Sequence, residues 1–454
     1  MRCPSPNRDD SRETRDEKEG VIAGLNRSGL NHPRISESSY ERMTRGRKAV
    51  HRMRVCVLIA LFVLACSFSA AAQTIRLEVG IAETSQQAGI DYIENVLIPA
   101  FEAEYPDIDV SLTIIGWSMD TYVTRYVANT APDVLQIGGD RVGTYVSMIE
   151  PLDRFVQGWA DLDDFPKALL DGARVDGVLY GIPWSMPIRS LKYRVDHFLE
   201  AGLDPRQPPS TWNEFVEYGR LLTRFDGQGN MIRQGYRTEG HWLEFAGWLF
   251  QAGGDYMNPE RTRFTFGGEA GQEAVAFLAS LIQEHEISHP TRALGDLRSN
   301  ETSMEVMQGS ILLVPEFRDI VAVAPPLRHR EQLQVAYANQ WVITNTSPNK
   351  DAAWKWIEFV TRIDNMIGYT LAALIVPPRT SIINYEPWAS DPRFIQLFQN
   401  TLLSKNLPFD SPHIDQARRE FIQPALNRIM YEGAPPSELA EAERLANAWL
   451  EERL

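Results

Sequence analysis

Residues 176–223 read DGVLYGIPWSMPIRSLKYRVDHFLEAGLDPRQPPSTWNEFVEYGRLLT. A short apolar run enters Pro183-Trp184, and after a loop the stretch 191–195 alternates apolar and polar residues, which predicts a β-strand. A short helix should follow and end at Gly202, because glycine readily takes the left-handed conformation that closes helices. The Pro-Pro-Ser-Thr-Trp turn at 208–212 then predicts the capped start of an amphipathic helix. Strands and helices that alternate in this way predict an α/β fold.

The chain between residue 73 and this stretch alternates strands and helices as well. Ile75–Ile81 alternates apolar and polar residues as a first strand, and Ile90–Tyr105 has apolar residues at helical spacing. Val110–Ile115 and Ala131–Gln136 are predicted as the second and third strands. Strand, helix and strand in this order make a βαβ unit, which places a helix on a growing parallel sheet.

The order of turns in residues 176–223 resembles the solute-binding proteins of ABC importers, in the maltodextrin-binding-like family that binds sugars and oligosaccharides. By themselves these residues are also compatible with an ordinary α/β loop, but the resemblance extends over nearly all of residues 73–454. Other matching phrases lie at Glu104–Ile108, Ile137–Arg141, Ile149–Asp153, Trp242–Gly254, Gly271–Glu284, Ser303–Leu313, Gln340–Ile343, Ser347–Trp354 and Phe421–Leu454. The resemblance implies a helix, a glycine and a strand for Ser303–Leu313, and helices at the end of the chain.

The same resemblance implies a two-lobed periplasmic-binding-protein fold, in which each lobe is a mostly parallel sheet flanked by helices. Lobe 1 should comprise residues 73–184 plus 321–377, and lobe 2 residues 185–320 plus 378–454. The chain should cross between them near Pro183, near Phe317–Ala322 and near Pro377. A solute bound between the lobes would favour the closed form through its differential contacts, and the permease would recognise that form.

The first 72 residues resemble an N-terminal extension and a secretory signal peptide. Val55–Phe68 is an apolar run of about fourteen residues, too short for the roughly 20 that span a membrane. A basic stretch precedes it and small residues follow it up to Ala72, the expected cleavage site, so we expect a periplasmic protein. Translation could start at Met1, Met43 or Met53, and a loose lipoprotein-type sequence makes a lipid on Cys66 the minor alternative.

The cysteine content and the net charge exclude several classes of function. Cys3, Cys56 and Cys66 all precede the expected cleavage site, so residues 73–454 need no disulfide and offer no thiol nucleophile. The first 72 residues hold 13 of the 45 Lys and Arg and 8 of the 60 Asp and Glu, which leaves the remaining 382 residues 32 basic and 52 acidic residues, a formal net charge of −20. Such an acidic chain is unsuited to nucleic acid, whose binding depends on neutralising phosphates.

A sugar offers hydroxyl groups at its edges and C–H groups on its faces. Carboxylates, amides and arginines suit the first, and flat aromatic rings suit the second. The chain has 11 tryptophans, and Trp117, Trp184, Trp242 and Trp341 fall where loops should face a cleft. For each of them a core or rim position is the alternative interpretation. Mid-helix positions at core spacing make that interpretation fit better for a second set of tryptophans, Trp248, Trp354 and Trp356.

Asp140 and Arg141 are the first polar candidates, because they follow a strand and two glycines, where parallel sheets place ligands. The resemblance adds that an Asp-Arg pair at this place hydrogen-bonds the sugar in some maltodextrin-binding relatives. The alternative is a helix-capping Asp beside a solvated Arg. Glu83 follows the first strand and is either a ligand carboxylate or a surface acid.

The remaining candidates come from the resemblance. Met186 and Arg189 follow the Gly-Ile-Pro-Trp crossover, after which relatives line the cleft. Arg379 follows Ile375-Val376-Pro377-Pro378, although the glycine that relatives have in this loop is missing. Glu316-Phe317 stands where relatives often have Gly-Pro-Trp, so Phe317 could keep a stacking role.

We therefore expect a binding protein that captures a sugar or oligosaccharide and delivers it to the permease subunits of an ABC importer, as a monomer without cofactor or metal. One rival is the same fold binding a glycerol phosphate, an osmolyte or a peptide, since Arg141, Arg189 and Arg379 could together hold an anion. The other rival is a secreted glycoside hydrolase, which would need two carboxylates roughly 5–10 Å apart. The chain contains no GxSxG, P-loop or GxGxxG motif of other enzyme classes.

Overall fold

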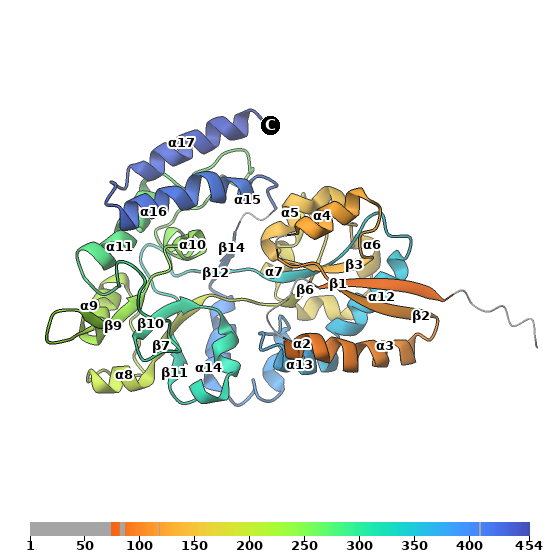
Figure 1. Cartoon of the computed structure of the whole chain (residues 1–454), viewed down its shortest axis with the longest axis horizontal. Helices are drawn as coiled ribbons and strands as arrows, with labels where there is room; N and C mark the ends of the chain where they lie inside the picture. Colours follow the sequence, from red (N-terminus) through yellow and green to blue (C-terminus); the bar gives the residue numbers. More distant parts are fainter. Residues whose placement is uncertain (1–73, 82–86, 118, 408–409) are drawn as a thin grey trace, which may run out of the picture. The chain divides into compact units, whose positions relative to one another are not determined.

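The structure is a computed structural model of the 454-residue chain, and it describes residues 74–81, 87–117, 119–407 and 410–454 (Figure 1). Gln73–Leu454 forms one compact unit. The predicted signal peptide, the alternative lipid site at Cys66, and the candidate Glu83 lie outside the described residues. In the part of the chain that is described, no helix is both long and apolar enough to cross a membrane.

The first sheet has the strand order β2-β1-β3-β13-β6. β1 is parallel to β2 and β3, whereas β13 runs antiparallel to β3 and β6. Its strands are β1 (Ile75–Ile81), β2 (Ile108–Ile114), β3 (Val134–Ile137), β6 (Ile182–Ser185) and β13 (Asn339–Ile343). The predicted strands are thus confirmed with small shifts at their ends. β3 begins after Pro132, which has no N–H to donate to a strand ladder.

Helices cover both faces of the first sheet. Figure 1 shows α2, α3 and α13 on one side of β1 and α4 and α5 on the other. Leu77 and Val79 of β1 are fully buried in the same core as Trp356 of α12, as their alternation along the strand requires. These helices are α2 (Gln87–Tyr92), α3 (Ile98–Glu104), α4 (Asp120–Val127), α5 (Val142–Tyr145), α6 (Asp153–Val156), α7 (Lys167–Asp171), α12 (Lys350–Thr361) and α13 (Ile363–Ala372), with a π-helical segment at Ile93–Leu97.

The second sheet has the order β11-β7-β10-β9-β8. β10 is parallel to β9, but β7 runs antiparallel to β10 and β11, and β8 runs antiparallel to β9. Its strands are β7 (Ser190–Arg194), β8 (Arg224–Phe225), β9 (Met231–Arg237), β10 (Thr302–Met307) and β11 (Val321–Val323). The α/β fold is confirmed, and this second sheet is more mixed in direction than the mostly parallel sheet that we expected.

Two helices beside the second sheet, α8 (Val195–Glu200) and α9 (Trp212–Leu222), lie where the sequence predicts them. Gly202 has φ +75° just after α8, and the side chain of Thr211 accepts the N–H of Glu214 as the cap of α9. Trp248 lies in the core between α10 and its neighbours, as its mid-helix position suggested. The helices beside this sheet are α8 (Val195–Glu200), α9 (Trp212–Leu222), α10 (Trp242–Gln251), α11 (Glu269–Gln283), α14 (Pro392–Thr401), α15 (Ile414–Ala417), α16 (Gln423–Tyr431) and α17 (Glu438–Glu451).

The prediction of helix, glycine and strand for Ser303–Leu313 is wrong. The structure has the reverse order: β10 comes first, and a 3-10 helix, Gly309–Leu313, follows it. β10 is the middle strand of the second sheet, and Met304 at its centre is fully buried. The methionines and glutamate of this stretch favour helix only weakly, and pairing with strands on both sides overrides that preference.

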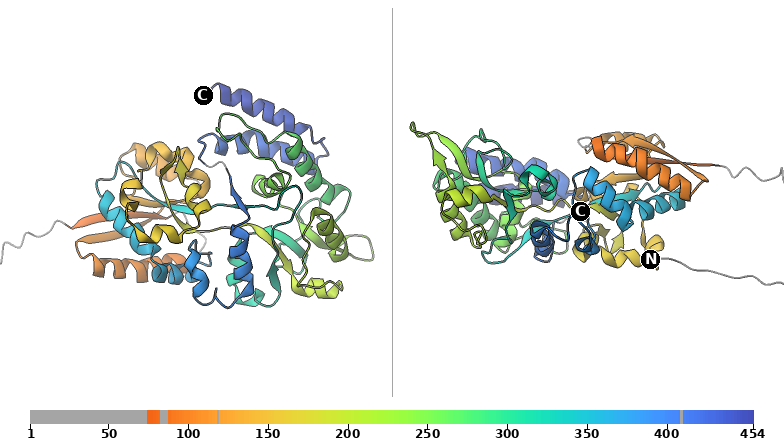
Figure 2. Two further views of the ribbon diagram at one scale, coloured as in Figure 1. Left: turned by 180° about the vertical axis from the view of Figure 1, so that it is seen from behind. Right: turned by 90° about the horizontal axis from the view of Figure 1, so that it is seen from below.

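The chain passes between the two sheets through segments 186–189, 324–338 and 373–391. A small parallel sheet of β12 (Gln334–Ala336) and β14 (Ser404–Asn406) lies between the two larger sheets in Figure 1, and Figure 2 shows the same unit from behind and from below. A short hairpin, β4 (Arg174–Val175) with β5 (Val178–Leu179), precedes the first passage. Since β11 pairs with β7, the second passage follows residue 323 instead of lying within 317–322. The lobe boundaries otherwise stay a prediction.

Candidate functional site

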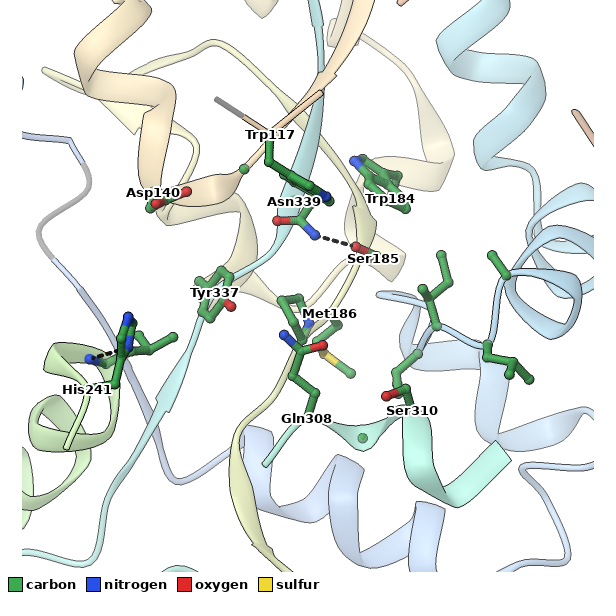
Figure 3. Close-up of a pocket in the computed structure, with 18 of the residues that line it drawn as sticks. Trp117, Asp140, Trp184, Ser185, Met186, His241, Gln308, Ser310, Tyr337 and Asn339 are labelled. Atoms are coloured by element: carbon green, nitrogen blue, oxygen red, sulfur yellow. Dashed lines mark hydrogen bonds between the residues drawn. The ribbon is translucent and has the colours of Figure 1, made fainter. Parts of the chain in front are cut away.

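A cavity of about 430 Å³ lies where residues from both sheets converge (Figure 3). Small-molecule sites in proteins are typically about 300–1,000 Å³, so the volume suits a small solute. Its aromatic and polar lining is Trp117, Asp140, Trp184, Ser185, His241, Trp242, Gln308, Ser310, Tyr337, Asn339 and Arg418, and its apolar lining includes Met186, Pro187, Leu243 and residues 373–376.

The lining follows from strand topology. Trp117 and Asp140 come after the carboxyl ends of the parallel strands β2 and β3, and Gln308 follows that of β10. Asn339 begins β13, which is antiparallel to β3, so its first residue lies at the same edge of the sheet. Open α/β sheets bind ligands at this edge, because loops there are free to carry recognising side chains.

The aromatic wall is provided by tryptophans that differ in exposure. Trp117 is 38% exposed, whereas Trp184 and Trp242 are only 2% and 6% exposed. The Trp184 ring lies 6.4 Å from that of Trp341 and 6.0 Å from that of Tyr369, so most of its surface belongs to the core. Its buried indole N–H has no hydrogen-bond acceptor among the described residues. Trp117 therefore offers the largest face that a solute can still cover.

The loop that carries Asp140 is held tightly. A Cβ added at Gly139 would lie 2.0 Å from the carbonyl oxygen of Ala338, so the backbones of the two segments approach as only glycine allows. Asp140 Oδ2 lies 2.8 Å from Arg418 Nη2 and 3.6 Å from Arg141 Nε. The carboxylate is thus fixed at the cavity edge by two guanidinium groups.

His241 presents a neutral ring to the cavity. Its Nδ1 accepts the backbone N–H of Leu243 at 3.2 Å and so caps α10, which leaves the proton on Nε2 as a donor. Burial, together with the positive charges of Arg189, Arg418 and Arg292, lowers the pKa of His241 to about 4. His241 is nevertheless an exposed residue and lines the cavity, so a solute can reach it.

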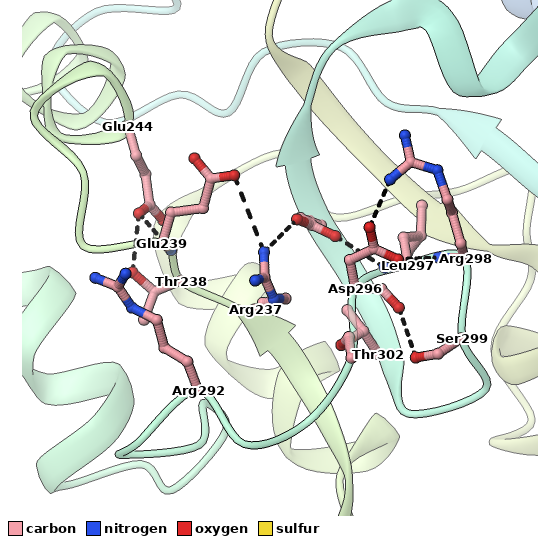
Figure 4. Close-up of polar contacts among 12 residues, drawn as sticks. Arg237, Thr238, Glu239, Glu244, Arg292, Asp296, Leu297, Arg298, Ser299 and Thr302 are labelled. Carbon is pink, nitrogen blue, oxygen red and sulfur yellow. Dashed lines mark hydrogen bonds and ion pairs between the residues drawn. The ribbon is translucent and has the colours of Figure 1, made fainter. Parts of the chain in front are cut away.

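The turn before His241 is anchored by a buried carboxylate, Glu244 (Figure 4). Glu244 accepts the hydroxyl of Tyr236, the hydroxyl of Thr238 at 2.9 Å, and the backbone N–H groups of Glu239 and Gly240 at 2.8 Å each. It is 2% exposed, and this burial raises the pKa of Glu244 to about 7. These hydrogen bonds tie the turn to α10 beside the cavity.

The floor of the cavity adds amide and hydroxyl groups. Asn339 Nδ2 donates to Ser185 Oγ at 2.9 Å, while Gln308 follows β10 and Ser310 lies in the 3-10 helix after it (Figure 3). Tyr337 lies between Asp140 and His241 in the same view, and burial raises its pKa to about 12, so its hydroxyl stays protonated. Donors and acceptors of both kinds therefore face one space, as a polyhydroxylated solute requires.

Comparison with known proteins decides the family. A family model described as bacterial extracellular solute-binding protein matches residues 84–367, which is more than half of the chain. The chain belongs to this family.

Curated relatives of this solute-binding protein match it over shorter stretches. It is 28% identical over 201 residues to a mannitol-binding protein of Pseudomonas aeruginosa, covering 42% of this chain and 44% of the relative. It is 30% identical over 138 residues to an sn-glycerol-3-phosphate-binding periplasmic protein of Escherichia coli, covering 28% of this chain and 31% of the relative. The chain spans about half the length, or less, of the curated relatives it matches. These relatives are binding proteins.

Among solved structures, an ABC transporter solute-binding protein from Thermotoga lettingae bound with α-D-tagatose has the same fold. The TM-score is 0.70 at 23% identity, over 83% of this chain and 100% of that one. The two-lobed periplasmic-binding-protein fold is thereby confirmed.

Some of the predicted site residues line the cavity of this solute-binding protein, namely Trp117, Asp140, Trp184, Met186 and Trp242. Others lie elsewhere. Arg141 forms an ion pair with Asp140, and Arg189 forms one with Glu239, but neither arginine lines the cavity. That the lining residues contact a solute stays a prediction.

Four further candidates are placed in the structure away from the cavity. Trp341 is 2% exposed in the core, with its ring 6.4 Å from that of Trp356. Phe317 is buried in a separate apolar cluster, and its neighbour Glu316 is exposed. Arg379 is 4% exposed and pairs with two carboxylates of the 3-10 helix Ala160–Asp164 before α7. Strand phase and local packing point these side chains away from the cleft.

Several lining residues were not predicted from the sequence, including His241, Gln308, Ser310, Tyr337, Asn339 and Arg418. Gln308 directly follows β10, but the sequence predicts a helix there, so the rule that ligands bind at strand ends could not point to it. Arg418 lies in a π-helical segment, Arg418–Ile422, and π-helical turns often occur at functional sites. No local pattern distinguishes this arginine from the adjacent Arg419, and only the tertiary fold brings it to Asp140.

Proposed function

We propose that this protein is the periplasmic substrate-binding component of an ABC importer, and that it captures a sugar or polyol in the cavity between its two sheets. The observation that carries this proposal is the lining itself. The flat aromatic face of Trp117 stands beside neutral donors and acceptors at His241, Asn339 and Gln308. Such a set matches the C–H faces and hydroxyl edges of one uncharged, hydroxyl-rich solute.

The charge around the cavity supports an uncharged solute over an anion. Of the arginines that could have held an anion, Arg379 does not line the cavity and pairs with Asp161 and Asp164, each at 2.8 Å. Arg141 and Arg189 pair with Asp140 and with a glutamate, respectively. A phosphate would have to displace one of these carboxylates, which would leave a partly buried charge without a partner.

The second candidate is the same cavity binding a glycerol phosphate, because one relative is named for that solute and a guanidinium group, that of Arg418, lines the cavity. Its pairing with Asp140 at 2.8 Å makes this candidate the weaker one.

Binding without catalysis is the mode of action that we propose. Hydrolysis of a glycoside needs two carboxyl groups roughly 5–10 Å apart on either side of the bond. Within the described lining, Asp140 is the carboxylate, and it is already held by Arg418. The relatives and the tagatose-bound neighbour are binding proteins, which supports the same reading.

In the proposed cycle, a monomer secreted through its signal peptide binds the solute, closes around it, and presents the closed form to the permease in the inner membrane. The solute supplies the free energy of closure through contacts that it makes with both sheets only in the closed form. Neither a cofactor nor a metal has a part in these steps.

The experiment that tests the proposal is a titration of the purified protein, followed by intrinsic tryptophan fluorescence. Tryptophans at the cavity wall make the emission sensitive to an occupied site. We expect saturable changes with at least one of lactose, mannitol, tagatose and maltose, and none with sn-glycerol 3-phosphate at the same concentrations. Saturation by the phosphate alone would favour the second candidate, and turnover of a glycoside would establish an enzyme.

A further inference from the structure

Five charged side chains of alternating sign form a row that passes along the edge of the cavity: Arg141, Asp140, Arg418, Asp415 and Arg419. Arg418 Nη2 lies 2.8 Å from Asp140 Oδ2, and the same nitrogen contacts Asp415 Oδ1. Arg419 closes the row from the solvent side by contacting the other oxygen of Asp415. One guanidinium group therefore bridges two carboxylates from distant parts of the chain.

Arg418 is held on its flat face as well as at its edge. Its guanidinium carbon lies 4.4 Å from the ring centroid of Trp242, which also lines the cavity. Its side chain is 11% exposed, and the side chains of Asp140 and Asp415 are 20% and 5% exposed. Burial lowers the pKa of Arg418 and the neighbouring Asp140 raises it, yet a guanidinium group stays charged in proteins. The charge of Arg418 thus remains and has to be balanced locally.

Asp140 and Arg418 are also the side chains of this row that line the cavity. We propose that Asp140 and Arg418 form the charge-selecting pair of this site: each positions and neutralises the other, so that together they accept an uncharged hydroxyl-bearing solute and reject solutes of either charge. This inference rests on the proposed function, since it assumes that the solute occupies this cavity.

The physical argument is one of balance. A pair of neighbouring hydroxyl groups can donate to the Asp140 carboxylate and accept from the Arg418 guanidinium without separating them. An anion gains attraction from Arg418 but meets repulsion from Asp140, whose oxygen lies 2.8 Å from the same nitrogen. A cation gains attraction from Asp140 but meets repulsion from Arg418. In a partly buried site such uncompensated charge is costly, so the balanced pair selects neutral solutes.

The test changes one charge at a time and measures affinity by titration calorimetry. The probes are lactose, mannitol and tagatose as neutral solutes, sn-glycerol 3-phosphate and glucuronate as anions, and glucosamine as a cation. We expect Asp140→Asn to lower the affinity for the neutral solute that binds best at least tenfold. The same variant should raise the affinity for an anion at least tenfold. We expect Arg418→Gln to lower the affinity for the same neutral solute by a similar factor and to raise the affinity for the cation glucosamine.

Two controls separate this role from a structural one. Arg419→Gln removes a positive charge that also contacts Asp415, but Arg419 is 67% exposed at its side chain and does not line the cavity, so affinities should stay within about twofold. Arg418→Lys keeps the charge without the planar fork, and it should preserve the rejection of glucosamine while losing part of the neutral affinity. A gain in anion binding by Asp140→Asn should also weaken with added salt.

The outcomes separate the inference from the proposed function. If the unaltered protein binds a neutral sugar but both variants lose affinity for all solutes alike, the pair does not select charge, and the proposed function still stands. If the unaltered protein binds sn-glycerol 3-phosphate more tightly than any neutral solute, both proposals are wrong. The charge-selecting pair predicts that Asp140→Asn gains affinity for anions, that Arg418→Gln gains affinity for glucosamine, and that Arg419→Gln keeps the affinities of the unaltered protein.

Discussion

Replacing Trp117 with alanine should weaken solute binding while leaving the fold intact. Trp117 is 38% exposed at the cavity wall. A tryptophan side chain presents up to about 250 Å², so roughly 95 Å² of its surface is open to a solute. At about 25 cal/mol/Å², full coverage would contribute at most about 2.4 kcal/mol. A solute that covers half of this face would lose about 1.2 kcal/mol, or about eightfold in Kd, on the substitution.

The matched control is Trp341→Ala, because Trp341 was also a candidate for the cleft but lies in the core. It is 2% exposed, and its loss should lower the free energy of unfolding by about 3–5 kcal/mol. Calorimetric titration and urea unfolding of both variants measure the two quantities separately. If Trp117→Ala lowers stability by several kcal/mol and the folded fraction binds normally, the assignment of Trp117 to the cavity wall is wrong.

Other substitutions test single features of the structure. Gly139→Ala places a Cβ 2.0 Å from the Ala338 carbonyl oxygen, so calorimetry should show at least tenfold weaker binding, whereas Gly247→Ala meets open space and should bind normally. Burial raises the folded-state pKa of Glu244 to about 7, above its unfolded value, so the folded state holds an extra proton between about pH 4.5 and 7. Stability should therefore fall as pH rises through this window, and urea unfolding of Glu244→Gln should show a shallower fall; an identical slope would contradict the shift. Arg379→Ala leaves its carboxylate partners unpaired, so the free energy of unfolding should fall by about 1–3 kcal/mol while the affinity for the solute is retained. Weaker solute binding by this variant would show that Arg379 belongs to the binding site.

The sequence predicted the fold because its local signals agree with one another. Gly202 at φ +75° and the capping side chain of Thr211 stand where their turn chemistry requires them. The exception is Ser303–Leu313, where long-range strand pairing decides the structure and local preference does not.

The candidate site was predictable only where topology determines position. Trp117 and Asp140 follow the ends of parallel strands, and that rule placed them at the cavity. Trp341 was misplaced because a one-residue difference in strand phase decides which face a side chain occupies. Arg418 could not be found, because its partner Asp140 is distant in sequence and only the tertiary fold brings them to 2.8 Å.

The most direct test of the account is a crystal structure of the protein grown with the neutral solute that binds best. The account predicts density for the solute in the cavity, against the face of Trp117 and within hydrogen-bonding distance of Asp140 and Arg418. Density for the solute on another surface, with this cavity holding only water, would contradict the proposed site.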